Sequence, residues 1–414
     1  MKRRNFFAAT SLFGVPMAKA AIETRPLPDD RLLERNADKY WARVRDEQFF
    51  LPGWRAFLNN GSLGIAPKPV VRAVAEYLEQ SAALTMDYYP RWGYETMDEQ
   101  RQEMADFYGC RKDELAFMHN ATEAMCTIAG GIDLKAGDEV IITDQEHPSG
   151  RGCWQMRQAR HAITLKEVKL PLPPKNPGQL TDLLIGSIGP RTRVLSFSGI
   201  TSPTGLILPI REICDAARAK GVITVVDGAH MHGQIPFKIS ELGCDYMAGS
   251  PHKWAYAPAG CGLLYVREEN LEKLWPSIMS GSWNRMDLKA ARFMNVGTNN
   301  RALFEGMMAG LRFLKQLGPE RVYGRMHELA RYYFNKAREC PQVELLTPDN
   351  DRMFGCLVAV RFKDAKLDAF HDALKKKRIW VTPGRQVRLS AHIHTRKSDI
   401  DLYFDTIRAT LGNT

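Results

Sequence analysis

One stretch decides the fold of this chain: ITVVDGAHMHGQ at residues 223–234, followed by CDYMAGSPHKWAYAPAGCG at residues 244–262. Its β-branched run predicts a fully buried parallel strand that ends on Asp227. An acid at the carboxyl end of such a strand lies where open α/β sheets bind ligands. Lys253 follows in a Ser-Pro-His-Lys loop, a setting that suits a Schiff base beside a phosphate. Together these features indicate pyridoxal phosphate chemistry.

Each residue type has a defined use in that chemistry. A carboxylate such as Asp227 keeps the pyridine nitrogen protonated, and Lys253 attaches the cofactor and then carries the Cα proton. Ser250 and His252 can donate to the phosphate, and the Asp-Gly-Ala-His spacing aims His230 near the ring. Taken singly, Asp227 is more typical of a helix cap, His230 of a core histidine and Lys253 of a surface lysine. Their order along one strand and loop favours the cofactor site.

Alternating strand and helix patterns from about residue 110 to 265 predict a mostly parallel sheet covered on both faces. The chain therefore has an α/β fold, and its 414 residues suit a large domain plus a smaller one. We predict that residues 21–55 pack on the small domain, that residues 56–300 form the large cofactor-binding domain, and that residues 301–414 form the small α+β domain.

Composition narrows the classes of partner. The net charge of +10 comes from scattered basic residues, with no basic stripe interleaved with aromatics, so nucleic acid is not expected as a partner. The eight cysteines form no CxxC or Cys/His cluster, so we expect no metal site and no dense disulfide framework. No apolar run approaches the length of a membrane span.

The N-terminus has the pattern of an export signal. Lys2-Arg3-Arg4-Asn5-Phe6-Phe7 is a twin-arginine motif, and an apolar stretch and Ala18-Lys19-Ala20 follow it. Residues 1–20 are therefore predicted to direct export of the folded, cofactor-loaded protein to the periplasm. A cytoplasmic enzyme with an incidental basic N-terminus is the alternative.

Several further motifs extend the pattern in a fixed order along the chain: Leu58-Asn59-Asn60-Gly61-Ser62-Leu63-Gly64, Asn120-Ala121-Thr122-Glu123-Ala124, Thr201-Ser202-Pro203-Thr204-Gly205 and Arg388-Leu389-Ser390. With the Asp227 and Lys253 segments, they make the chain resemble the class V aminotransferase family of fold-type I pyridoxal phosphate enzymes. The resemblance is strongest to the isopenicillin N epimerase-like branch, with cysteine desulfurases as cousins. It implies a seven-stranded sheet and a homodimer with shared active sites.

The resemblance also implies roles for residues that are weak candidates alone. The Asn120-Ala121-Thr122-Glu123 helix start would bind phosphate through the backbone N–H groups and the Thr122 hydroxyl. His147 would stack on the cofactor, and Thr298 would reach the phosphate bound by the partner subunit. Ordinary N-caps and half-buried histidines fit the same patterns.

Two residues are implied to bind the substrate. Arg388 would hold the α-carboxylate through a bidentate guanidinium, and Asn60 would lie near the same carboxylate. A surface arginine and a structural turn are the alternatives. The partner of the cofactor's ring hydroxyl is unassigned, with Thr201 or Ser202 as substitutes for the desulfurase asparagine.

The sequence leaves the net reaction open. Loss of the Cα proton from an amino acid or small peptide leads to epimerisation, to β-elimination of the C–S lyase type, or to amino transfer. The segment between Cys356 and Arg388 contains no desulfurase cysteine, so epimerisation is the first expectation. His230 and Tyr256 are both candidates for a second proton donor. A cofactor-free periplasmic binding protein is the non-enzymatic alternative.

Overall fold

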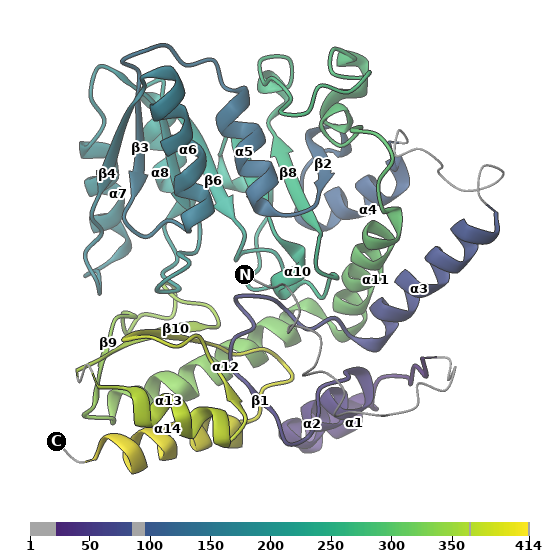
Figure 1. Ribbon diagram of the computed structural model, residues 1–414, viewed down its shortest axis with the longest axis vertical. Coiled ribbons are helices and arrows are strands. Elements are labelled where there is room, and N and C mark those ends of the chain that lie inside the picture. Colours follow the sequence, from purple (N-terminus) through teal and green to yellow (C-terminus); the bar gives the residue numbers. More distant parts are fainter. Residues whose placement is uncertain (1–21, 85–95, 364–365, 413–414) are drawn as a thin grey trace, which may run out of the picture.

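The computed structural model describes residues 22–84, 96–363 and 366–412, and a seven-stranded sheet dominates it (Figure 1). The strand order is β2-β8-β7-β6-β5-β3-β4, and only β8 runs antiparallel to its neighbours. The strands are β2 (Leu115–Met118), β3 (Glu139–Thr143), β4 (Thr164–Val168), β5 (Thr192–Ser198), β6 (Ile223–Gly228), β7 (Tyr246–Gly249) and β8 (Gly262–Val266). The predicted α/β fold with a mostly parallel sheet is confirmed.

Helices enclose this sheet because its strands are apolar on both faces. In β6 every residue after Ile223 is buried, as expected of a central parallel strand. Helices α5 and α6 pack together, as do α7 and α8, and β6 contacts both α5 and α8. The helices of this part are α3 (Lys68–Ala83), α4 (Asp98–Tyr108), α5 (Ala121–Gly131), α6 (Pro148–His161), α7 (Pro177–Gly186), α8 (Ile210–Ala219), α9 (Ile239–Leu242) and α10 (Pro251–Trp254).

The C-terminal part has a sheet of its own. Strands β9 (Val343–Leu345), β10 (Leu357–Phe362) and β12 (Gln386–Ser390) form an antiparallel sheet in the order β12-β10-β9. Helix α12 contacts β10 and α14 (Figure 1). The helices here are α11 (Arg301–Leu317), α12 (Pro319–Arg338), α13 (Asp368–Lys376) and α14 (Lys397–Leu411).

Two connections join the parts. Strand β1 (Ala56–Phe57) pairs in parallel with β11 (Ile379–Trp380), so the chain leaves the C-terminal part just before its Asn-Asn-Gly-Ser loop. Helix α11 packs lengthwise on α3, which places it between the two parts (Figure 1). The predicted boundary at residue 300 falls at the start of this connecting helix and stays a prediction.

The N-terminal segment has a fixed place. Helices α1 (Asp30–Arg35) and α2 (Ala37–Gln48) precede β1, and the buried Arg45 of α2 donates to the carbonyl of His394 at 2.6 Å. Asp38 pairs with Arg325 of α12 at 2.7 Å. Residues 1–20, which carry the predicted export signal, lie outside the described residues.

Two local features were not predicted from the sequence. The Ser-Pro-His-Lys segment is a one-turn helix, α10, with Pro251 in its first turn, where a missing N–H costs nothing. The short strand β7 just before it lacks the β-branched run that marks β6. Across the described ranges, no helix is long and apolar enough to cross a membrane, and no His/Cys/Asp/Glu group is placed to hold a metal.

Candidate active site

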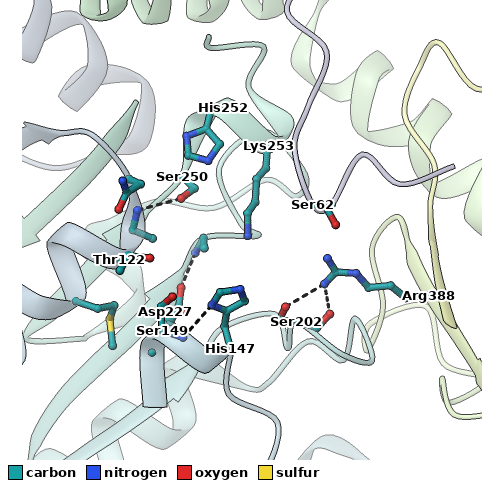
Figure 2. Close-up of a pocket in the computed structure, with 16 residues that line it drawn as sticks. Ser62, Thr122, His147, Ser149, Ser202, Asp227, Ser250, His252, Lys253 and Arg388 are labelled. Carbon is teal, nitrogen blue, oxygen red and sulfur yellow. Dashed lines mark hydrogen bonds between the residues drawn. The ribbon is translucent and has the colours of Figure 1, made fainter. Parts of the chain in front are cut away.

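A cavity of about 270 Å³ opens at the carboxyl ends of the parallel strands and faces the C-terminal part (Figure 2). Its walls bring together residues that are far apart in sequence. Of the predicted site residues, those that line it are Ala121, Thr122, His147, Asp227, Ser250, His252, Lys253 and Arg388. The topology explains this convergence, because β2, β3, β6 and β7 all deliver their following loops to the same edge of the sheet.

Lys253 projects from α10 into the cavity (Figure 2). The pKa of its amine is lowered to about 8, chiefly by burial, while Asp227 opposes the shift and the nearby Arg388 cation adds to it. Its carbonyl accepts a 2.6 Å hydrogen bond from the Asn60 side chain. A lysine amine that is easily deprotonated and held by its backbone is suited to covalent attachment of a carbonyl compound.

His230 lies between Lys253, Trp254 and Arg388. The indole N–H of Trp254 can only donate, and it points at His230 Nδ1 from 3.3 Å. On the other side of the ring, Nε2 lies 3.2 Å from the Lys253 amine and 3.4 Å from a guanidinium nitrogen of Arg388. Burial keeps the pKa of His230 well below its ordinary value, so the ring is neutral and adds no positive charge beside the Lys253 amine.

Asp227 lies near the carboxyl end of β6, where, among the described residues, one of its carboxylate oxygens is hydrogen-bonded and the other is not. Its Oδ1 accepts from the N–H of Ala229 at 2.9 Å, and no donor within the described chain reaches Oδ2. The side chain is only 6% exposed. Gly150 makes room for it, since a Cβ there would lie 3.3 Å from Oδ2. A buried carboxylate oxygen without a donor fits a protonated ring nitrogen.

The opposite end of the cavity is built for an anion. Thr122 lies in the first turn of α5, where backbone N–H groups and the helix dipole favour negative charge. Ser250 accepts from the N–H of Ala121 at 3.1 Å, so its hydroxyl proton is free to turn to the cavity. His252 is fixed by a 2.6 Å hydrogen bond from Nδ1 to the carbonyl of Cys261. These groups form the predicted phosphate end.

His147 approaches the cavity from the side opposite Lys253 (Figure 2). It caps α6, and its Nδ1 accepts from the N–H of Ser149 at 3.2 Å. The neutral ring therefore carries its proton on Nε2. Burial and the Lys253 charge lower the pKa of His147, although Asp227 acts the other way. The ring is placed to stack on a bound cofactor.

The preceding residue, Glu146, is a feature that the sequence reading missed. It is fully buried, where Thr143 donates to its Oε1 at 2.5 Å and Ser198 donates to its Oε2 at 2.6 Å. Burial raises the pKa of Glu146 to about 7, and the Asp227 charge adds to the rise. In the sequence, only the position of Glu146 directly before His147 could have indicated that it lies at the site. Glu146 ties the His147 loop to β5.

Arg388, on β12, brings the C-terminal sheet to the cavity. Its guanidinium donates to the carbonyl and, at 3.1 Å, to the hydroxyl of Ser202 (Figure 2). Burial lowers its pKa to about 10, which leaves it charged at neutral pH. No carboxylate of the described chain pairs with it. Gly61 keeps space beside it, since a Cβ there would lie 3.4 Å from its terminal nitrogen. This cation can receive a substrate carboxylate.

Other candidates lie elsewhere. The side-chain nitrogen of Asn60 donates to the Lys253 carbonyl and its oxygen lies 3.3 Å from His394, so Asn60 positions Lys253. Asn60 does not line the cavity, whereas its neighbours Gly61 and Ser62 do. Tyr256 is buried against Phe313 and His392, away from the cavity.

The two candidates for binding the cofactor's ring hydroxyl lie in different surroundings. Thr201 is fully buried and bonds Thr204 at 2.7 Å, whereas Ser202 lines the cavity. Thr298 is exposed and does not line the cavity of its own chain. The prediction that it completes the partner's phosphate site remains a prediction.

The donor set fits pyridoxal phosphate. An amine that readily loses its proton, a buried carboxylate oxygen without a donor, an anion-binding helix end and a flanking imidazole surround one cavity. This fold and site define a pyridoxal phosphate-dependent enzyme of fold type I.

Comparison with known proteins identifies the family. The Aminotransferase class-V model matches residues 56–414. The isopenicillin N epimerase of Streptomyces clavuligerus is 32% identical over 381 residues, which cover 86% of this chain and 94% of that protein. A cysteine desulfurase of Klebsiella pneumoniae (strain 342) is 30% identical over 312 residues, covering 71% of this chain and 75% of the relative. The chain belongs to the class V aminotransferase family.

A solved structure shares the fold. The complex of the cystine C-S lyase C-DES with cysteine persulfide superposes with a TM-score of 0.77 at 23% identity, covering 87% of this chain and 98% of that one. Family membership supports an enzyme rather than a cofactor-free binding protein.

Proposed function

We propose that this enzyme removes and returns the Cα proton of an L-amino acid or small peptide, with inversion at Cα as the net reaction. One observation carries the proposal: Lys253 and His147 reach the same cavity from opposite sides (Figure 2). Inversion needs a proton acceptor on one face of Cα and a donor on the other. The relationship to isopenicillin N epimerases supports the same outcome.

The roles follow from the side-chain geometry. Arg388 binds the α-carboxylate and so orients the Cα–H bond toward Lys253. The Lys253 amine, whose pKa is lowered to about 8 chiefly by burial, accepts the proton in its uncharged form. Pyridoxal phosphate, when bound, supplies the electron sink for the charge that develops at Cα. His147 borders the other face, and it returns a proton there only after its imidazole has taken one up from solvent, so that a neutral ring is left behind. The earlier candidates are less suitable, because His230 contacts Lys253 itself and Tyr256 lies away from the cavity.

A β-eliminating lyase is the second candidate, since cysteine desulfurases are among the relatives. A desulfurase needs a cysteine that reaches the substrate sulfur. No cysteine lines the cavity in the described part of the chain, and burial raises the pKa of Cys356 well above its ordinary value. Elimination from the substrate therefore ranks above persulfide formation, and amino transfer ranks third.

The test is incubation of the holoenzyme with L-amino acids in deuterated water, followed by chiral analysis and mass measurement. The proposal predicts a deuterated, inverted product. The variant His147→Phe should keep the ring stack and exchange of the L-substrate, but it should lose inversion by about a hundredfold or more. Pyruvate and ammonia would instead identify a lyase. A product that forms only with added 2-oxo acid would identify an aminotransferase.

A further inference from the structure

An apolar groove of about 440 Å³ runs along the outside of the Asn-Asn-Gly-Ser loop. Its main walls come from the N-terminal segment, this loop and β11, through Phe50, Phe57, Leu63, Ile65 and Trp380. Three of these side chains are well exposed, with Phe50 at 56%, Trp380 at 55% and Leu63 at 46%. Exposed apolar side chains around a hollow are typical of a ligand site.

The groove borders the reaction cavity. Ser62 lines both, and the rest of the loop separates them. The loop is held in place, since the N–H of Gly64 donates to the carbonyl of His252 at 3.0 Å and Ser62 Oγ donates to Asn59 at 2.9 Å. Ser62 thus forms a short, fixed lip over which a substrate can extend from one space into the other.

A cation lies at the side of the groove formed by Phe57 and Trp380. The guanidinium carbon of Arg55 is 5.6 Å from the ring centroids of both Phe57 and Trp380. Among the residues the structure describes, no carboxylate forms an ion pair with Arg55. A guanidinium stacked on aromatic rings, with its N–H edge unpaired, is ready to bind an anion.

We propose that this groove holds the substrate's side chain, and that the substrate is an amino acid with an extended apolar arm ending in a carboxylate. The α-carboxylate would bind Arg388 beside Lys253, the arm would cross Ser62, and the terminal carboxylate would meet Arg55. This inference deepens the proposed function and rests on it. The shared lining residue Ser62 and the unpaired Arg55 favour substrate over a second copy of the chain.

Calorimetric titration of the holoenzyme with three probes tests the groove without requiring turnover. The probes are alanine, α-aminooctanoate and α-aminosuberate, which share the α-carbon groups and add first the apolar arm and then its carboxylate. We expect affinity to rise in that order, by about tenfold or more at each step. Arg55→Met should weaken α-aminosuberate alone by about tenfold. Trp380→Ala should weaken both long probes and leave alanine unchanged.

Arg378→Met is the matched control, because Arg378 stacks on Trp54 at 5.2 Å and does not line the groove. It should change none of the three affinities. Equal binding of the three probes, or equal losses in both arginine variants, would overturn the inference. So would a Trp380→Ala variant that changes the oligomeric state in light scattering but not the probe affinities, since the groove would then be a subunit contact. If the probes bind in the expected order but show no Cα–H exchange, the proposed reaction fails while the groove assignment stands.

Discussion

The chemistry of the site depends on the charge state of Lys253. Burial is the main cause that lowers the pKa of its amine to about 8, while Asp227 opposes this shift and the Arg388 cation adds to it. His230, which burial keeps neutral, lies 3.2 Å from the amine and adds no charge of its own. A small rise in pH above neutrality therefore frees the lone pair that attachment of a carbonyl compound requires.

Reactivity of cofactor-free protein toward an amine reagent should show this directly. We expect Lys253 to react with a midpoint near pH 8, below the 10.5 of an ordinary lysine. Because folding lowers this pKa, the unfolded chain binds more protons between those values, and the free energy of unfolding should rise with pH across that window. Arg388→Met should raise the midpoint by removing a cation. Arg385→Met is the control and should leave the midpoint unchanged, because the Arg385 side chain donates to the carbonyl of Phe362 instead. A midpoint near 10.5 in the wild type would contradict the site electrostatics.

At the scale of elements, the strands were predictable and the loops between the two parts were not. The β-branched run of β6 and the acid at its end placed Asp227, and the Ser-Pro-His-Lys order placed Lys253. Asn60 shows the limit. Its turn-rich neighbourhood predicted a loop at the site, but only the packing of that loop on α10 shows that its amide bonds the Lys253 carbonyl. Glu146 was missed for the same reason, since its partner Ser198 is distant in sequence.

The close contact between that loop and α10 leads to a prediction. A Cβ at Gly64 would lie 2.2 Å from the carbonyl oxygen of Lys253, a backbone atom that cannot move away cheaply. Gly64→Ala should therefore lower the free energy of unfolding by roughly 1–3 kcal/mol and weaken cofactor binding. Gly53→Ala, in the same segment with no atom within 4 Å of the added Cβ, is the control and should be close to neutral. Urea unfolding and cofactor titration measure both, and equal effects in the two variants would refute the contact.

At the scale of the whole molecule, we propose a homodimer with shared sites. The segment that follows β8 exposes apolar side chains, with Trp275 at 52% and Met279 at 82%, and the rings of Trp275 and Trp283 stack at 6.2 Å. Exposed apolar surface of this kind is typical of a subunit interface. Thr298 lies further along the same stretch and is exposed, so a second copy is needed for it to reach a cavity.

Light scattering should therefore show a dimer. Met279→Glu should weaken it, whereas Met156→Glu, at a 42% exposed position on α6, should not. Thr298→Val should leave the dimer intact and weaken cofactor binding by about tenfold, the usual scale for one hydrogen bond to a charged group. A monomer that binds the cofactor at full affinity would rule out shared sites.

We also propose export of the folded enzyme through the twin-arginine motif in residues 1–20. Changing Arg3 and Arg4 to lysine keeps the positive charge but removes the arginine pair. We expect the protein to remain in the cytoplasm, with its cofactor bound, as judged by cell fractionation. Unchanged recovery from the periplasm would show that the N-terminus is incidental.

The central claim is that Lys253 holds the cofactor, and borohydride reduction tests it most directly. Reduction of the holoenzyme fixes the Schiff base, and peptide mapping then identifies the tagged lysine. We predict the tag on Lys253 and its loss in Lys253→Ala. A tag on any other lysine, or none in a protein that retains the cofactor's absorption band, would contradict the account.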